Sequence, residues 1–164
     1  MKQNICIIGL NNAFTVKVSK KIADSFDMFF ADISALIEFE LLDIEHARVV
    51  CGEEYIHKVE RSKVKMVNSF ENTLFSMDYS LLNDESSYNL TKENSFIVYL
   101  RFSKNNLEEI DKKYDVKVSG KSLIYDVYEF RNQLCEKYAD IVVDCDNLTD
   151  NEIVKATTNK FLQK

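Results

Sequence analysis

A short stretch near the amino terminus has the position, but not the side chains, of a phosphate-binding loop. The apolar run Ile5–Ile8 ends at Gly9, and a lysine-rich amphipathic run begins six residues later, at Thr15. The stretch between them lies where proteins that cradle phosphates carry the pattern G-x-x-x-x-G-K-[ST]. Here it reads Gly9-Leu10-Asn11-Asn12-Ala13-Phe14-Thr15-Val16, and only the first glycine matches. The location therefore suits a phosphate, whereas the residues that would neutralise its charge are missing.

The stretch still allows some anion binding. A helix that starts near Thr15 would present free N–H groups and the positive end of its dipole, which favour an anion without any lysine. Asn11, Asn12 and Thr15 could add hydrogen bonds, so the sequence allows a weak site for phosphate, sulfate or a nucleotide. Lys17 lies about half a turn of helix beyond Thr15 and cannot simply replace the absent lysine.

These residues belong to a chain in which strands alternate with helices. We expect strands at Ile5–Ile8, Met28–Ala31, Thr73–Ser76, Ser95–Leu100 and Ile141–Val143, where apolar runs are short and rich in β-branched residues. We expect helices at Thr15–Ser25, from Asp32 or Ser34 to Glu40, at Glu53–Ser69, Leu107–Tyr114 and Ser122–Tyr138, and from Thr149 to Phe161. The polar stretches Asp43–Cys51, Tyr79–Glu93 and Asp115–Lys121 are expected to be irregular. The alternation predicts an α/β fold, with a five-stranded parallel sheet flanked by helices and one domain over residues 1–164.

Composition limits the classes of function. No apolar run approaches the roughly 18–20 residues of a membrane span, and no signal peptide is recognisable, so we expect a cytoplasmic protein without membrane contact. The net charge is −6 and the lysines are dispersed, which argues against nucleic-acid binding. The four cysteines show no C-x-x-C spacing and are expected to be buried free thiols. The chain has only three glycines and no proline, which is unusual for an enzyme that folds loops around phosphates.

Four segments, in order along nearly the whole chain, resemble shikimate kinase, a small P-loop kinase of the nucleoside-monophosphate-kinase type. They are the opening NICIIGL with the following VxxxIA, the segment FFADISALIE, the pair Gly52-Glu53 followed by Glu60, and the segment from Arg131 to Asp144. The resemblance implies the three-layer P-loop kinase fold. It also implies Mg-ATP as cofactor and shikimate as the acceptor substrate.

The phosphate-binding residues of that family are replaced here. The family's P-loop lysine, which neutralises charge on the β- and γ-phosphates, falls on Thr15. The hydroxyl that binds Mg²⁺ in the family falls on Val16, and the inner glycines fall on Asn12 and Phe14. The resemblance thus predicts weak or absent binding of Mg-ATP at a site formed by Gly9, Asn11, Asn12, Thr15 and Lys17.

The residues that would hold Mg²⁺ and the acceptor are partly kept. Asp32 matches a family aspartate and is either a helix cap or a catalytic or Mg²⁺-associated carboxylate. The family's second aspartate falls on Ser34 and an acceptor arginine falls on His57, which is either a pocket-wall residue or a base. Arg131 matches a retained arginine and is either a carboxylate clamp or a surface ion-pair former.

Two functions follow from this pattern. The first is a shikimate-kinase-like protein without effective phosphoryl transfer, which acts as a regulatory or binding module, with a nucleotide, a shikimate-like molecule or a protein as its partner. The alternative is a divergent kinase that transfers the γ-phosphate of ATP to shikimate in aromatic amino-acid biosynthesis. In the alternative, Ser34, His57 and Arg131 hold the acceptor, Asp32 supports Mg²⁺ or acts as base, and Lys17 or Lys121 moves toward the phosphates.

Overall fold

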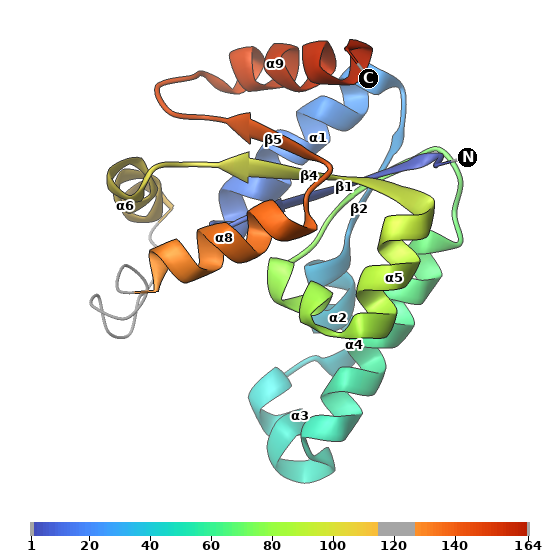
Figure 1. Cartoon of the computed structure of the whole chain (residues 1–164). Coiled ribbons are helices and arrows are strands. Elements are labelled where there is room, and N and C mark those ends of the chain that lie inside the picture. Colours follow the sequence, from blue (N-terminus) through green and yellow to red (C-terminus); the bar gives the residue numbers. More distant parts are fainter. Residues whose placement is uncertain (1, 115–126, 164) are drawn as a thin grey trace.

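The five-stranded parallel sheet predicted from the sequence is confirmed. The computed structural model describes residues 2–114 and 127–163, and within them the strands are β1 (Asn4–Gly9), β2 (Phe29–Asp32), β3 (Thr73–Ser76), β4 (Ser95–Arg101) and β5 (Ile141–Asp144). All neighbouring strands are parallel, in the order β2-β3-β1-β4-β5 (Figure 1). Because parallel strands end on the same edge, the loops that follow β1, β2 and β3 come together there.

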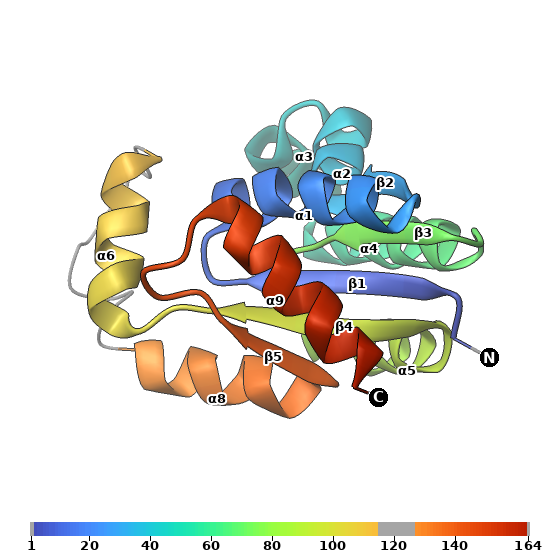
Figure 2. The ribbon, with the colours of Figure 1, turned by 90° about the horizontal axis from the view of Figure 1, so that it is seen from above.

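Helices cover both faces of the sheet (Figures 1 and 2). The described helices are α1 (Asn12–Phe26), α2 (Ile33–Leu41), α3 (Ile44–Cys51), α4 (Glu53–Asn68), α5 (Glu85–Asn94), α6 (Lys104–Lys113), α8 (Tyr128–Tyr138) and α9 (Asp150–Leu162), with a 3₁₀ helix, η1, at Tyr79–Asn83. Helices α1 and α9 lie over one face, and α4, α5 and α8 lie over the other. The result is the three-layer arrangement expected for a P-loop kinase fold.

The central strand β1 explains why two cores form. All six of its residues are buried, and alternate side chains point to opposite faces. Ile5 and Ile7 join the core under α1 and α9, whereas Cys6 and Ile8 join the core against α2, α4 and α8. A strand buried on both faces is apolar at most positions, which is why Ile5–Ile8 is an unbroken apolar run. The buried Asn4 at its start is hydrogen-bonded to the backbone of Phe70 and Thr73.

Two stretches predicted to be irregular are helical. Asp43–Cys51 contains α3, which begins where the Asp43 carboxylate accepts a 2.9 Å hydrogen bond from the backbone N–H of His46. Tyr79–Glu93 contains η1 and most of α5, and Asp84 caps α5 through the N–H of Ser87 at 2.9 Å. Both stretches are polar because their helices bury few side chains, and capping aspartates were the available signal. Residues 115–126, including Lys121 and the start of the helix expected from Ser122, lie outside the described residues.

The cysteine prediction needs one correction. Cys6, Cys135 and Cys145 are buried and free, as expected, but Cys51 is exposed at the end of α3. Burial raises the pKa of the Cys135 and Cys145 thiols to about 12, which makes them unreactive at neutral pH. None of the described helices is long and apolar enough to cross a membrane.

Candidate functional site

The loop after β1 is much shorter than predicted. Strand β1 ends at Gly9 and α1 begins at Asn12, so only Leu10 and Asn11 connect them. The side chain of Asn11 caps α1 by accepting a 2.8 Å hydrogen bond from the N–H of Phe14. Its carbonyl accepts a 3.0 Å bond from the N–H of Thr15. The predicted start of the helix at Thr15 is therefore wrong, and the N–H of Thr15 is not free for an anion.

Thr15, at the position of the family's lysine, lies against the first glycine of the loop. Its side chain is 1% exposed, and its Oγ1 donates a 2.7 Å hydrogen bond to the carbonyl of Asn11. A Cβ atom placed on Gly9 would lie 2.3 Å from this Oγ1, which is closer than real Cβ contacts. Glycine is thus required at position 9 for the packing of Thr15, without any ligand.

Helix α6 is attached to the same loop. The side chain of Asn11 donates a 2.7 Å hydrogen bond from Nδ2 to Oδ1 of Asp111, and both residues are buried. The ring of Phe14 contacts Phe102 edge-to-face, with centroids 4.9 Å apart, and Tyr114 at 6.3 Å. Phe14, at the position of an inner glycine of the family's loop, therefore points into the core rather than toward a phosphate.

A cavity of about 660 Å³ opens beside this loop, and its charged lining is acidic. Four predicted site residues, Gly9, Asn11, Asn12 and Asp32, come together in its wall, whereas Ser34, His57 and Arg131 do not line it. The full lining is Gly9, Leu10, Asn11, Asn12, Ala13, Val16, Asp32, Asp78 and Asp111. Among the described residues the lining has three carboxylates and neither lysine nor arginine, and such a set creates a negative potential that disfavours phosphates.

The three aspartates of the cavity each hold part of the backbone or a neighbouring side chain. Asp32 caps α2 by accepting a 3.1 Å hydrogen bond from the N–H of Ala35, as its N-cap reading predicted. Asp78 caps η1 through the N–H of Ser80 at 2.8 Å, and Asp111 accepts from Asn11. No group of three or more histidine, cysteine or acidic residues among the described residues is arranged to hold a metal ion. The described residues therefore supply no all-protein metal cage, and Asp32 remains a single candidate carboxylate for Mg²⁺, which proteins commonly hold with one or two carboxylates and substrate phosphates.

Lys17 points away from the loop cavity. Its Nζ lies 2.9 Å from Oδ2 of Asp150, at the start of α9, and Lys21 contacts the same oxygen at 2.8 Å. Hydrogen bonds to Asp150 and Tyr114 raise the pKa of Lys17 above its usual value, so this ammonium is stably charged and engaged. Lys17 lines a separate cavity of about 540 Å³ between α1, α6 and the start of α9.

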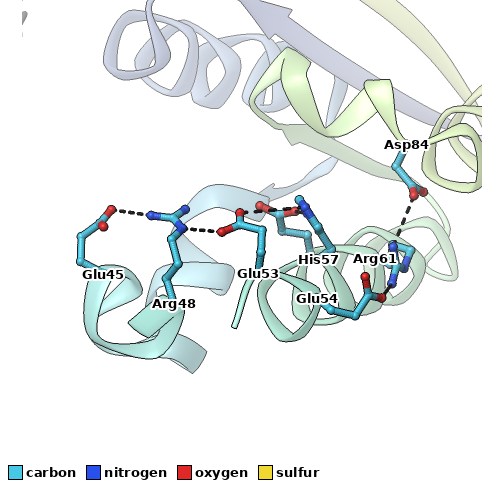
Figure 3. A network of polar contacts seen from close by, with 8 residues as sticks. Glu45, Arg48, Glu53, Glu54, His57, Arg61 and Asp84 are labelled. Carbon is cyan, nitrogen blue, oxygen red and sulfur yellow. Dashed lines mark hydrogen bonds and ion pairs between the residues drawn. The ribbon is translucent and has the colours of Figure 1, made fainter. Parts of the chain in front are cut away.

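His57 belongs to a network of charged residues on α3 and α4 (Figure 3). Its Nδ1 lies 2.9 Å from Oε2 of Glu60, and its Nε2 lies 3.9 Å from Oε1 of Glu53. The hydrogen bond to Glu60 raises the pKa of His57, so the imidazole carries positive charge over a wider pH range. His57 lines a hollow of about 430 Å³ with Ser80 and Asn83, apart from the residues of the loop cavity.

Arg131, on α8, lies near Tyr79, on η1. Burial raises the pKa of the Tyr79 hydroxyl, and the positive charge of Arg131 opposes this rise, which places the two groups close together. Arg131 forms no ion pair with an acidic residue in the described part of the chain. The described residues therefore give no support to the prediction that Arg131 forms a surface ion pair. Ser34 is half-buried in the first turn of α2.

Asp111 is the site residue that sequence reasoning missed. It follows Leu107 by four positions in an amphipathic helix, on the face that also carries Ile110 and Tyr114. An acidic residue at a core-facing helical position needs a partner, and this signal was available in the sequence. Asp78 also lines the loop cavity, and its carboxylate caps η1.

Comparisons with known proteins agree with the fold and with the sequence resemblance. No family model matches the chain. The shikimate kinase of Dictyoglomus turgidum is 26% identical over 162 residues, which cover 93% of this chain and 94% of the relative. Among solved structures, shikimate kinase from Acinetobacter baumannii in complex with shikimate has a TM-score of 0.82 at 14% identity, covering 99% of this chain and 94% of that one. Shikimate kinase from Aquifex aeolicus has a TM-score of 0.78 at 22% identity, covering 98% of this chain and 96% of the other. The chain is thus similar to shikimate kinases in sequence along nearly its whole length and shares their fold.

Proposed function

We propose that this chain is a shikimate-kinase-like protein that no longer transfers phosphate from ATP and that acts as a regulatory or binding module. The observation that carries the proposal is the packing of Thr15 on Gly9. The side chain at the lysine position is buried and hydrogen-bonded to the carbonyl of Asn11, so no cation can reach a phosphate from there. Removing one charge-stabilising group typically slows an enzyme about 10²–10³-fold.

The surroundings of the loop support the same proposal. The cavity beside it is lined by Asp32, Asp78 and Asp111, which repel a triphosphate unless a cation intervenes. Lys17, the nearest helical lysine, is held by Asp150 and Tyr114. Bringing Lys17 to the phosphates would require breaking these contacts.

The alternative, a divergent active shikimate kinase, is favoured by one observation on the residues predicted to bind the acceptor. Arg131 lacks an acidic partner among the described residues, and His57 is a cation below its raised pKa. Both could receive the carboxylate of a shikimate-like acid. This feature is also compatible with a module that binds the acid without phosphorylating it.

A calorimetric titration separates the two functions. The protein is titrated with Mg-ATP up to millimolar concentration, with and without shikimate, and phosphoryl transfer is then followed in a coupled assay. We expect no heat from Mg-ATP and no turnover above background. Micromolar binding that shikimate strengthens would overturn the proposal.

Two controls make the result decisive. Arg131→Ala distinguishes turnover by this chain from turnover by a contaminating kinase, because only the former falls on substitution. A cooperative thermal unfolding transition in each sample shows that the protein was folded when a titration gave no heat. A titration with shikimate alone then tests whether the acceptor side binds an acid by itself.

A further inference from the structure

The outer faces of α2 and α3 expose large apolar side chains that the described chain does not cover. Phe39 and Leu42 lie three positions apart at the end of α2 and are 79% and 87% exposed. Val49 and Val50 in α3 are 84% and 66% exposed. We call these four exposed side chains, with the acidic residues that neighbour them in the sequence, the α2–α3 face. Large exposed apolar surfaces commonly mark sites of protein interaction.

Helix α3 gains little support from its own chain. None of its residues is buried, and only Ile44 and Ala47 pack partly against the core. Figure 1 shows this helix below α2 and α4, away from the sheet. An eight-residue helix is marginal in water unless an apolar face is buried. A partner on the valine side of α3 would supply that burial.

The backbone at Leu42 adopts a strained conformation while its apolar side chain is exposed. Its φ and ψ are 58° and −55°, and the N–H of Asp43 donates a 2.6 Å hydrogen bond to the carbonyl of Leu41, which makes a γ-turn centred on Leu42. This turn is rare and strained for a residue with a Cβ atom, by about 1–3 kcal/mol. The exposed leucine makes no buried contact that would offset this strain.

The charges around the α2–α3 face define the partner it fits. Residues 38–54 contain six carboxylates, namely Glu38, Glu40, Asp43, Glu45, Glu53 and Glu54, against one arginine, Arg48, one histidine, His46, and no lysine. Arg48 forms ion pairs with both Glu45 and Glu53 (Figure 3). Glu40 and Glu54 are paired with Lys63 and Arg61 of α4. Glu38 and Asp43, which flank Phe39 and Leu42, have no basic partner among the described residues. The surface is therefore apolar with an excess of negative charge.

We propose that the α2–α3 face docks a basic amphipathic helix of a different protein. Its apolar side would cover Phe39, Leu42, Val49 and Val50, and its lysines or arginines would pair with the unmatched carboxylates. A second copy of this chain fits poorly, since a two-fold contact would place this acidic surface against itself. The inference goes beyond the proposed function, because it holds whether or not the loop binds ATP.

A designed peptide tests the charge and the apolar character together. The probe is a helical peptide of about 15 residues with leucines on one face and lysines on the other. The control peptide has the same sequence with a glutamate in place of each lysine. Binding to the full chain is measured by fluorescence anisotropy. We expect the basic peptide to bind at least tenfold more tightly than the acidic one. Its affinity should also fall as salt rises from about 0.1 to 1 M.

Three variants locate the contact. Leu42→Gly relieves the turn and should weaken peptide binding at least tenfold without lowering the free energy of unfolding. The double variant Val49→Ser and Val50→Ser should weaken binding similarly. Phe130→Ala removes a side chain that is 68% exposed on α8 and should leave binding unchanged. This control distinguishes binding at the α2–α3 face from non-specific binding to exposed apolar side chains.

Three results would overturn the inference. The first is equal or undetectable binding of the two peptides. The second is an equal loss of binding in Phe130→Ala. The third is a stable dimer in sedimentation velocity that Val49→Ser with Val50→Ser dissociates, since a second copy would then cover the face.

Discussion

Asn11 and Asp111 are 100 positions apart in the chain and are joined by a buried hydrogen bond of 2.7 Å between Nδ2 and Oδ1. This bond attaches α6 to the loop after β1. The same asparagine caps α1 through its Oδ1, so the amide group donates through Nδ2 and accepts through Oδ1. An asparagine can donate to Asp111 while it accepts from the helix, and an ionised aspartate at the same position could not donate.

Replacing this amide by a carboxylate should destabilise the protein in a pH-dependent way. Asn11→Asp keeps the helix cap but brings two carboxylates into hydrogen-bond contact, and we expect the free energy of unfolding to fall by about 2 kcal/mol at pH 7. Repulsion raises the pKa of the pair in the folded state, so the loss should shrink as the pH falls toward about 4. Urea unfolding at several pH values measures this. Asn11→Ser, which also caps a helix, is the uncharged control, and an equal loss at every pH would contradict the carboxylate contact.

The contact between Gly9 and Thr15 predicts strong coupling between two substitutions. Gly9→Ala places a methyl group 2.3 Å from Oγ1 of Thr15 and should cost about 1–3 kcal/mol. Thr15→Ala removes that oxygen, so the double variant should lose at least about 1 kcal/mol less than the sum of the single variants. Denaturant unfolding of all four proteins measures the coupling.

Gly52→Ala supplies the matched control for that cycle. Gly52 has a φ of 82° with no atom near its missing Cβ, so alanine there strains the backbone without a clash. Its cost should be the same with Thr15 or alanine at position 15. Additive losses for Gly9 and Thr15 would mean that the threonine does not occupy the space above the glycine.

The sheet was predictable from sequence, whereas the loop was not. Strands β1 and β4 are buried on both faces, so nearly every residue is apolar and the signal is local. The early start of α1 depends on Asn11, whose second partner is in α6, and no local pattern contains that information. Helix α3 was missed for a different reason, because it is only eight residues long and buries none of them, so its apolar pattern is too short to indicate a helix by itself.

Asp84 should stabilise the protein at neutral pH and lose this effect in acid. Hydrogen bonds from Ser86 and the N–H of Ser87 lower the pKa of its carboxyl to about 2. Because the folded pKa lies below the unfolded value, the contribution is complete above about pH 4 and is lost as the pH falls toward 2. We expect Asp84→Ala to lower the free energy of unfolding by about 1 kcal/mol at pH 7. The difference from the unsubstituted protein should narrow in urea unfolding at about pH 3, and a constant difference would contradict the role of the charge.

The pair of His57 and Glu60 makes the opposite prediction for pH. The hydrogen bond to Glu60 raises the pKa of His57, so the stabilisation from this pair is complete below the unfolded value of about 6.5 and disappears as the pH rises through the raised value. NMR titration of the imidazole should therefore give a pKa above 6.5, and Glu60→Gln should lower it. Glu54→Gln is the control, because Glu54 bonds Arg61 rather than His57 and its charge is a smaller influence on the imidazole. An unchanged His57 titration in Glu60→Gln would mean that the 2.9 Å contact does not persist in solution.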